Sequence, residues 1–440
     1  MSQIEFSESA KIVQTFFESS SGELGQVTGF VQRVSKMTAQ VFVKVLVLGL
    51  LEKGTSTLNE LVEVSSDLGV DISESGLRQR FNAGGAALLQ GLFERGMKAF
   101  SAQQGIGSGL LASFKVVNII DSTQLSLPAL LSGLFRGSGG SASSAGAKLQ
   151  VCYEYQSGTL STVELGEACV PDQSSSVPQQ CAVVGSLTLV DLGYFKQALL
   201  VALSQLQAFF LMRLHTQTSL YWQAEDKQPA DVLSVLQRSD QPCGEMTVYV
   251  GAQARVGVRL IYQKLPAEVV AQRHRQAHTN AHKKGRTCSA RHLAWLAWTV
   301  YITNVPLSVW TPQQAILTYR LRWHIELLFK LWKSQAHLDV LRCHRPESFR
   351  CLLYARLLGL LIFHWLVAPY RFPDGAELSL TKAFHLFQHA MPRWIDAIAD
   401  GWLDFVRCLA RFIHRLSRLA RATSRRKRPS TRQRLLALAV

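Results

Sequence analysis

Two aspartates, Asp121 and Asp191, follow short runs of apolar residues and are candidates for catalysis. The runs are residues 115–120, which are rich in β-branched side chains, and residues 186–190. Such runs are typical of buried strands, and functional carboxylates in mixed α/β sheets often lie where a strand ends. A turn or helix cap is the ordinary role of one such aspartate. Two of them, on strands that can be neighbours, favour a shared site.

A third carboxylate, Glu326, lies in a segment that has the periodicity of an α-helix and contains no Pro or Gly. At about 100° per residue, four polar residues fall in one stripe about 60° wide and about 21 Å long. They are Tyr319, Arg322, Glu326 and Lys333. The stripe places one carboxylate between two cations and a phenol. Apolar residues form a separate stripe that can pack on a sheet: Leu321, Ile325, Leu328 and Trp332.

This pattern suits phosphodiester chemistry. Carboxylates hold divalent metal ions, Arg and Lys hold phosphate oxygens, and Tyr donates a hydrogen bond. The alternative is a solvated charged face in which Arg322 and Glu326 form an i,i+4 pair. The two aspartates upstream weigh against that alternative.

The motif Y-x2-R-x3-E-x6-K, met here by the four residues of the stripe, resembles the signature of bacterial insertion-sequence transposases of family four. These are DDE enzymes with a ribonuclease-H-like core. Further blocks resemble the same family: residues 121–123, 191–195, 302–306 and 322–326. The resemblance covers about residues 30–350, and its blocks appear in the family's order.

The resemblance implies that Asp121, Asp191 and Glu326 hold two Mg²⁺ ions, for which Mn²⁺ can substitute. It further implies that Tyr319, Arg322 and Lys333 bind the phosphate at the 5′ end of the element. The expected reaction is cut-and-paste transposition by two-metal phosphoryl transfer, with hairpin ends and no covalent protein–DNA link. The expected partners are double-stranded inverted-repeat ends, target DNA and a second copy of the chain in the synaptic complex.

Two further residues match positions that the family uses on DNA. Arg213 closes a predicted strand and matches a basic residue near the DNA end. Trp298 lies where relatives carry an aromatic residue that accepts a flipped base. A cation at a strand end and a tryptophan of the core are the alternatives.

The resemblance and the pattern together predict an α/β fold: a ribonuclease-H-like mixed sheet with a β-rich insertion, flanked by helical terminal regions. The predicted strands are residues 115–120, 149–155, 160–167, 186–190, 209–214, 246–251 and 254–264, with a helix at 194–206. Residues 137–147 contain only Gly, Ser and Ala and predict a flexible loop.

The chain of 440 residues divides into five predicted segments. They are a helical DNA-binding region at 1–105, the first part of the catalytic core at 106–214, the β-rich insertion at 215–299, the closing part of the core with Glu326 at 300–345, and a helical basic region at 346–440.

The N-terminal region contains a possible helix-turn-helix. Residues 73–81 read as a capped helix start, with Ser73 or Ser75 as the N-cap. Arg78 and Arg80 follow in the next turns, where a recognition helix would place them. A surface helix of a bundle is the alternative, and the pattern does not decide between the two.

The formal net charge is +16 and the pI is about 9.7, which points to a polyanionic partner. Residues 401–440 hold eleven Lys or Arg and one acid. Their basic residues form an i, i+4, i+8, i+11 series and then a dense cluster that can clamp DNA: Arg407, Arg411, Arg415 and Arg418, followed by Arg425, Arg426, Lys427 and Arg428. A solvated tail is the alternative.

The remaining expectations concern location and class. The eight cysteines without CxxC spacing indicate a reduced compartment, and a bacterial, cytoplasmic, nucleoid-associated protein is expected. The apolar residues 352–368 include Arg356 and His364, which favours a buried helix over a membrane span. The competing functions are a catalytically inactive or domesticated DNA-binding relative and a general nuclease of the same core.

Overall fold

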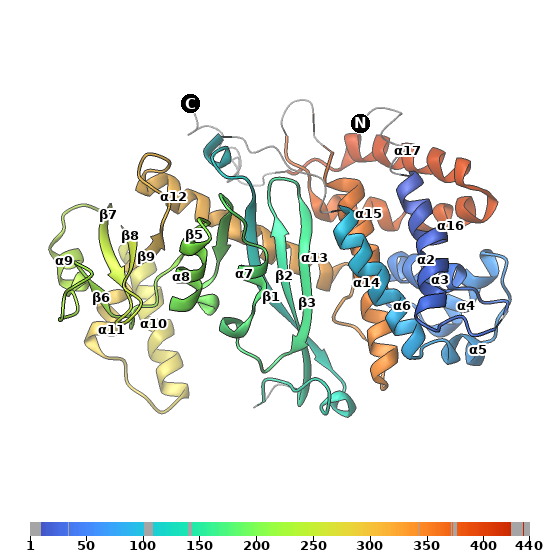
Figure 1. The fold of residues 1–440 in the computed structure, drawn as a ribbon, viewed down its shortest axis with the longest axis horizontal. Helices are drawn as coiled ribbons and strands as arrows, with labels where there is room; N and C mark the ends of the chain where they lie inside the picture. The colour runs from blue at the N-terminus through green and yellow to red at the C-terminus, as the bar shows by residue number, and fades with distance from the viewer. Residues whose placement is uncertain are drawn as a thin grey trace.

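The computed structural model describes residues 10–33, 35–100, 109–139, 143–341, 343–370, 372, 376–423 and 434. A nine-stranded mixed sheet crosses the molecule, and a body of helices built from both ends of the chain lies at its side (Figure 1). The α/β fold with a mixed sheet and flanking helices is as the sequence predicts.

Five strands form the first part of the sheet. The second and third strands along the chain form an antiparallel hairpin, and the second strand also pairs antiparallel with the first. The fourth and fifth strands run parallel to the first. Helix α8 (Gln197–Gln205) connects the fourth and fifth strands. The strands are β1 (Val117–Leu127), β2 (Ala145–Glu154), β3 (Thr159–Glu167), β4 (Leu187–Val190) and β5 (Phe209–Arg213), in the spatial order β3-β2-β1-β4-β5.

Two strands are longer than the sequence predicts. Strand β1 does not end at Asp121, because its pairing with β2 continues to Leu127 after its pairing with β4 has stopped at Ile120. Strand β2 begins at Ala145, inside the segment predicted to be a flexible loop. Small side chains make that possible, since a Cβ on Gly146 would lie 2.9 Å from the Cβ of Ala168.

The insertion extends the same sheet. Strand β9 pairs antiparallel with both β5 and β8, so the insertion hairpin joins the core through β9. The predicted division at residues 299 and 300 therefore lies inside a strand. The elements are β6 (Leu220–Tyr221), α9 (Val232–Arg238), β7 (Cys243–Val250), β8 (Val256–Lys264), α10 (Ala267–Lys283), α11 (Ala290–Trp295) and β9 (Trp298–Thr303).

The two terminal regions fold together into one helical body, which the sequence did not predict. Helix α14 (Pro346–Val367) packs against α3 (Ala39–Lys53) and α6 (Ala83–Phe100). The other helices of the body are α2 (Ser21–Val27), α4 (Leu58–Asp67), α5 (Glu74–Gln79), α15 (Leu380–Gln388), α16 (Met391–Asp400) and α17 (Trp402–Leu419).

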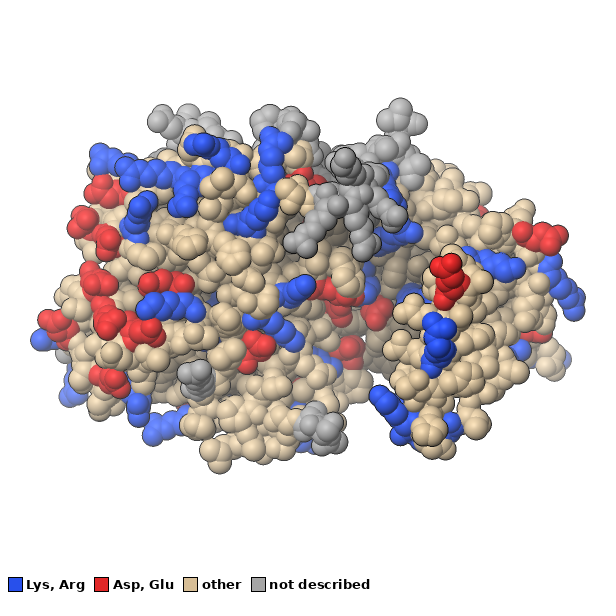
Figure 2. Space-filling view, turned by 180° about the vertical axis from the view of Figure 1, so that it is seen from behind, with Lys and Arg blue, Asp and Glu red and all other residues tan. Residues whose placement is uncertain are grey.

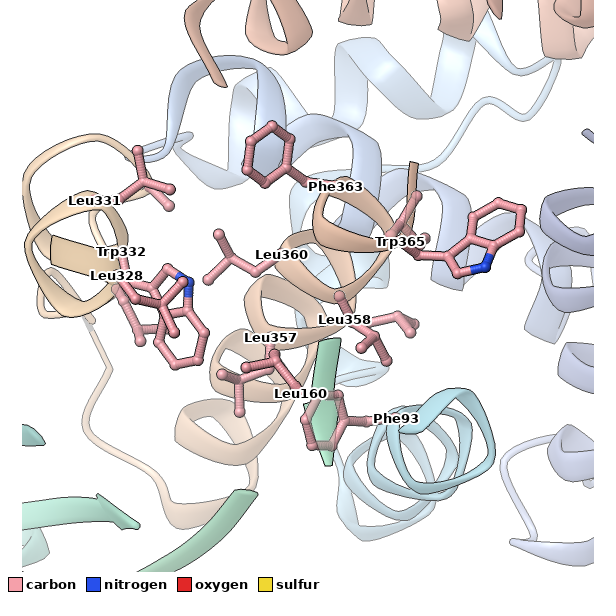
Figure 3. Packing of buried hydrophobic residues seen from close by; sticks show 14 of the residues in the cluster. Phe93, Leu160, Leu328, Leu331, Trp332, Leu357, Leu358, Leu360, Phe363 and Trp365 are labelled. Carbon is pink, nitrogen blue, oxygen red and sulfur yellow. The ribbon is translucent and has the colours of Figure 1, made fainter. Parts of the chain in front are cut away.

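Helix α14 is the centre of this body. It is long and apolar enough to cross a membrane, but its most apolar window is 89% buried inside the protein, as expected of a core helix. Figure 3 shows its side chains between those of α6 and those of α13 (Trp323–Ser334), with Leu160 of β3 close by.

A buried hydrogen bond joins α13 to α14. Trp332 Nε1 donates to His364 Nε2 at 3.2 Å, and both side chains are almost fully buried. Burial lowers the pKa of His364 to about 3, so the imidazole is neutral and can accept the bond at neutral pH. This contact attaches the helix that carries Glu326 to the helical body.

We expect Trp332→Phe to lower the free energy of unfolding by about 1–3 kcal/mol, because His364 Nε2 would stay buried without a donor. Urea unfolding followed by circular dichroism measures the change. Trp323→Phe, on the same helix but 58% exposed, is the matched control and should change stability by less than about 0.5 kcal/mol. Equal losses in the two variants would contradict a role for the buried bond.

Candidate active site

The strand register places three of the predicted site residues in one row. Ile120 of β1 pairs with Val190 of β4, and Val190 pairs with Met212 of β5. The next residue along each strand is therefore Asp121, Asp191 or Arg213, in one row across three parallel strands. Asp121 lies at the point where the sheet narrows, since only β2 accompanies β1 beyond it.

The predicted helix over residues 319–333 is interrupted. Helix α12 (Pro312–Tyr319) ends at Tyr319, a 3₁₀ turn, η6, covers Arg320–Arg322, and α13 begins at Trp323. In a 3₁₀ turn, residues three apart lie one above the other. Tyr319 and Arg322 accordingly reach the same carboxylate: Tyr319 Oη lies 3.4 Å and Arg322 Nε 3.9 Å from Asp191 Oδ1.

The three carboxylates converge on one guanidinium group. Arg322 Nη1 donates to Asp121 Oδ2 at 3.0 Å, and Nη2 donates to Glu326 Oε1 in an i,i+4 pair. With Asp191 beside Nε, one cation lies within ion-pair reach of all three acids. The sequence predicted that these acids meet, and it assigned Arg322 to a phosphate and not to the acids as a group.

The electrostatics of the cluster favour cation binding. The pKa of Asp121 is raised to about 6, chiefly by burial and also by the negative charges of Asp191 and Glu326, although the Ser122 N–H group and Arg322 act in the opposite direction. Burial together with the nearby Asp191 also raises the pKa of the Tyr319 phenol, which therefore stays protonated and can donate.

Three carboxylates on two strands and a helix are the hard oxygen ligands that Mg²⁺ and Mn²⁺ prefer. Within the described ranges, however, no His, Cys, Asp or Glu side chains form a ready-made metal-binding group. Arg322 supplies the positive charge at that place. The donor set fits a divalent cation once the guanidinium of Arg322 has moved away from the acids.

Thr303 and Asn304 hold the strand that supports this cluster. Thr303 Oγ1 donates to Phe210 O at 2.6 Å, and the Asn304 side chain accepts from Phe210 N and donates to Ala208 O, both at 2.8 Å. These bonds tie the end of β9 to β5, whose last residue is Arg213. The Thr-Asn block that resembles the transposase family therefore has a positioning role here.

A buried polar network beside Asp121 escaped the sequence analysis. Lys148 Nζ and Gln150 Nε2 donate to Asp172 Oδ1 at 3.0 and 2.9 Å, and Tyr194 donates to Gln150. Gln150 pairs with Ser122, the residue after Asp121. Polar residues at alternate positions of a predicted strand were the available signal, because side chains two apart share a face.

Arg213 and Trp298 lie beside a second feature, a pocket of about 320 Å³ that also includes Leu192 and Arg273. Trp298 is only 5% exposed and makes an edge-on contact with Tyr262 at 5.9 Å between ring centroids. In this conformation its ring belongs to the core. The placement of Arg213, near Tyr301 and Tyr319, agrees with a position next to the carboxylate cluster.

The other predicted DNA contacts lie apart from the carboxylates. Lys333 is in the last turn of α13, near Asp339. Arg78 is exposed on the six-residue helix α5, which Ser73 caps, whereas the guanidinium of Arg80 lies 6.0 Å from the ring of Phe30. The predicted cluster Arg425, Arg426, Lys427 and Arg428 lies outside the described residues.

Helix α17 carries a basic surface. Arg407, Arg411 and Arg418 are exposed on it, and Arg415 is partly exposed. Figure 2 shows Lys and Arg gathered along one edge of the molecule, at the side that the C-terminal helices occupy. Of these four arginines, Arg407 pairs with an acid of the same helix, Asp404, at 2.7 Å. The other three keep the surface positively charged.

Comparisons with known proteins find a family match and several relatives. Residues 112–362 match the family described as "Transposase DDE domain". The chain is 28% identical to the transposase for insertion sequence element IS231F of Bacillus thuringiensis subsp. israelensis, covering 81% of this chain and 79% of that one. It is 26% identical to the transposase for IS1151 of Clostridium perfringens, covering 89% and 88%. Among solved structures, a piggyBac transposase synaptic complex with hairpin DNA superposes with a TM-score of 0.48 at 9% identity, covering 96% and 87%.

We expect Arg322→Met to lower the metal-free free energy of unfolding by about 1–3 kcal/mol, because three acids would face one another without a cation. Mg²⁺ should raise the unfolding midpoint more in this variant than in the unchanged protein, since it would not have to displace the guanidinium. Differential scanning calorimetry with and without Mg²⁺ measures both effects. Arg320→Met, at an exposed residue two positions earlier in the same 3₁₀ turn, is the control. An equal Mg²⁺ response in all three proteins would show that Arg322 does not compete with the metal.

The raised pKa of Asp121 predicts a pH dependence. Since protons compete with a cation for the carboxylate, Mn²⁺ affinity should fall by about tenfold per pH unit below pH 6 and level off above about pH 7. In the metal-free protein, folding favours the protonated form of Asp121. The free energy of unfolding therefore contains a stabilising contribution from this residue at low pH, which is lost as the pH rises through about 6. Calorimetric Mn²⁺ titrations between pH 5 and 8 test the prediction, and a flat affinity would contradict it.

Proposed function

Because the chain belongs to the DDE transposase family, and is thus an enzyme that cleaves and transfers DNA, we propose that Asp121, Asp191 and Glu326 are its catalytic residues and hold two Mg²⁺ ions. The single observation that supports this assignment best is the convergence of the three acids on Arg322 from β1, the end of β4 and α13. They are far apart in the sequence, and a structural role would not require them to meet.

Asp121, Asp191 and Glu326 would hold the divalent ions, which would supply Lewis-acid activation of the attacking oxygen and neutralise charge at the leaving oxygen. The residues of the chain do the rest. Arg322, when released from the acids, is free to pair with a phosphate in bidentate fashion. Tyr319 keeps its proton and donates a hydrogen bond, and Lys333 adds positive charge further along α13.

We further propose that the substrate is the double-stranded end of an insertion sequence and that the reaction is cut-and-paste through a hairpin at that end. The relatives are transposases of insertion sequences, which supports the substrate class. The exposed arginines of α17 and the net charge of +16 support binding to a polyanion. Pairing two ends requires two copies of the chain on DNA, with a symmetric arrangement as the simplest case.

We expect Asp121→Asn, Asp191→Asn and Glu326→Gln each to lower the rate of Mg²⁺-dependent cleavage of an element-end duplex at least about 1,000-fold, because each removes a ligand charge. Binding of the duplex should persist. Gel assays of nicking, with fluorescence anisotropy for binding, measure the two properties separately. Asp396→Asn, which removes an exposed acid of α16, is the control and should cleave normally.

Three outcomes would contradict the proposal. If one of the three variants nicks DNA at a normal rate, the acid that it replaces is not a metal ligand. An unchanged protein that binds ends but does not cut with Mg²⁺ or Mn²⁺ is a DNA-binding relative without catalysis. Cutting of duplexes that lack the element ends, without joining to target DNA, would indicate a general nuclease.

A further inference from the structure

A pocket of about 380 Å³ lies in the helical body, apart from the carboxylate cluster. Its walls come from the turn between α3 and α4, from α5, from the segment that follows α13 and from one face of α14. The volume is in the range of sites that hold small ligands. Helix α13 separates the two sites: Glu326 is in its first turn, whereas the pocket begins at Val340, beyond its last residue.

A buried guanidinium lines the pocket. Arg356 is 5% exposed, and its Nη2 donates to Gly54 O at 2.7 Å. Its Nε and Nη1 are buried and meet no acceptor among the residues that the structure describes. Burial lowers its pKa to about 10, so the group still carries its charge at neutral pH. A buried cation with two nitrogens that lack an acceptor is expected to have an anionic partner.

The other residues of the pocket agree with an anion. Arg78 and Arg345 are exposed beside it, and two hydroxyl-bearing residues, Thr55 and Ser348, also line it. None of the described residues that line the pocket is acidic. The N-terminus of the 22-residue helix α14 lies at the same place and adds the positive end of its dipole.

We propose that this pocket binds a phosphate group, held by Arg356 at its base and by Arg345 and Ser348 of α14 at its mouth. A guanidinium matches phosphate oxygens with two parallel hydrogen bonds, and hydroxyl groups complete such sites. The source we assign is a backbone phosphate of the bound DNA, which rests on the proposed function; free inorganic phosphate has the same chemistry. Occupancy would join the N-terminal helices, through Arg78, to the segment that follows the catalytic helix.

The first test uses inorganic phosphate and the full chain without divalent metal. Sodium phosphate, compared with sodium chloride at equal ionic strength, should raise the unfolding midpoint of the unchanged protein. Arg356→Met should weaken the apparent phosphate affinity about tenfold or more. Arg350→Gln, which removes an exposed charge of α14 outside the pocket, is the matched control and should respond normally. An equal response in the unchanged protein and Arg356→Met would overturn the site.

Should Arg356→Met fail to fold, the double variant Arg345→Gln with Ser348→Ala replaces it, because both side chains reach the surface. Glu326→Gln should keep the full phosphate response, so this test stands even if the assignment of the catalytic acids is wrong.

The second test identifies the source of the phosphate. Binding of an element-end duplex is measured against salt concentration by fluorescence anisotropy. Loss of one phosphate contact should reduce the slope of log affinity against log salt by about 0.9 in Arg356→Met and leave Arg350→Gln unchanged. A lost response to inorganic phosphate with an unchanged DNA slope would overturn the DNA source and leave a free phosphate compound as the ligand.

Discussion

The sharing of the Arg322 guanidinium among three carboxylates is the interaction on which the site depends. Like charges this close repel one another in a partly buried place, and the repulsion is relieved only because one cation lies within reach of all three. The strand register brings Asp121 and Asp191 together, and the 3₁₀ turn before α13 brings Arg322 and Glu326 over them.

The rest of the fold holds these two halves in place. Strand β9 is tied to β5 by Thr303 and Asn304 and so keeps the row of Asp121, Asp191 and Arg213 in register. On the other side, the buried face of α13 rests on α14 through Trp332. The sheet and the helical body thus hold opposite ends of one short segment, the sheet through Tyr319 and the helical body through Trp332.

Much of this was predictable from local patterns. Apolar runs located the strands, and the motif around Glu326 located the third acid. The predictions that were wrong concern contacts between distant segments. The predicted end of the first strand at Asp121 is one of them, because β1 continues to pair with β2 after its pairing with β4 has ended. The 3₁₀ turn lets Tyr319 and Arg322 both lie beside Asp191, which is far away in the sequence. The packing of the two terminal regions depends on contacts between residues about 300 positions apart, such as the hydrogen bond from Arg356 to Gly54. Periodicity contains no information on such distant contacts.

The packing of α3 against α14 has a consequence during synthesis. The face of α3 that packs against α14 is complete when Lys53 leaves the ribosome, but α14 itself is complete only at Val367. At about 5–20 residues per second, the nascent chain exposes that surface for roughly 15–60 s. A chain that ended before α14 would therefore keep this apolar face of α3 uncovered, as a binding surface for chaperones and proteases.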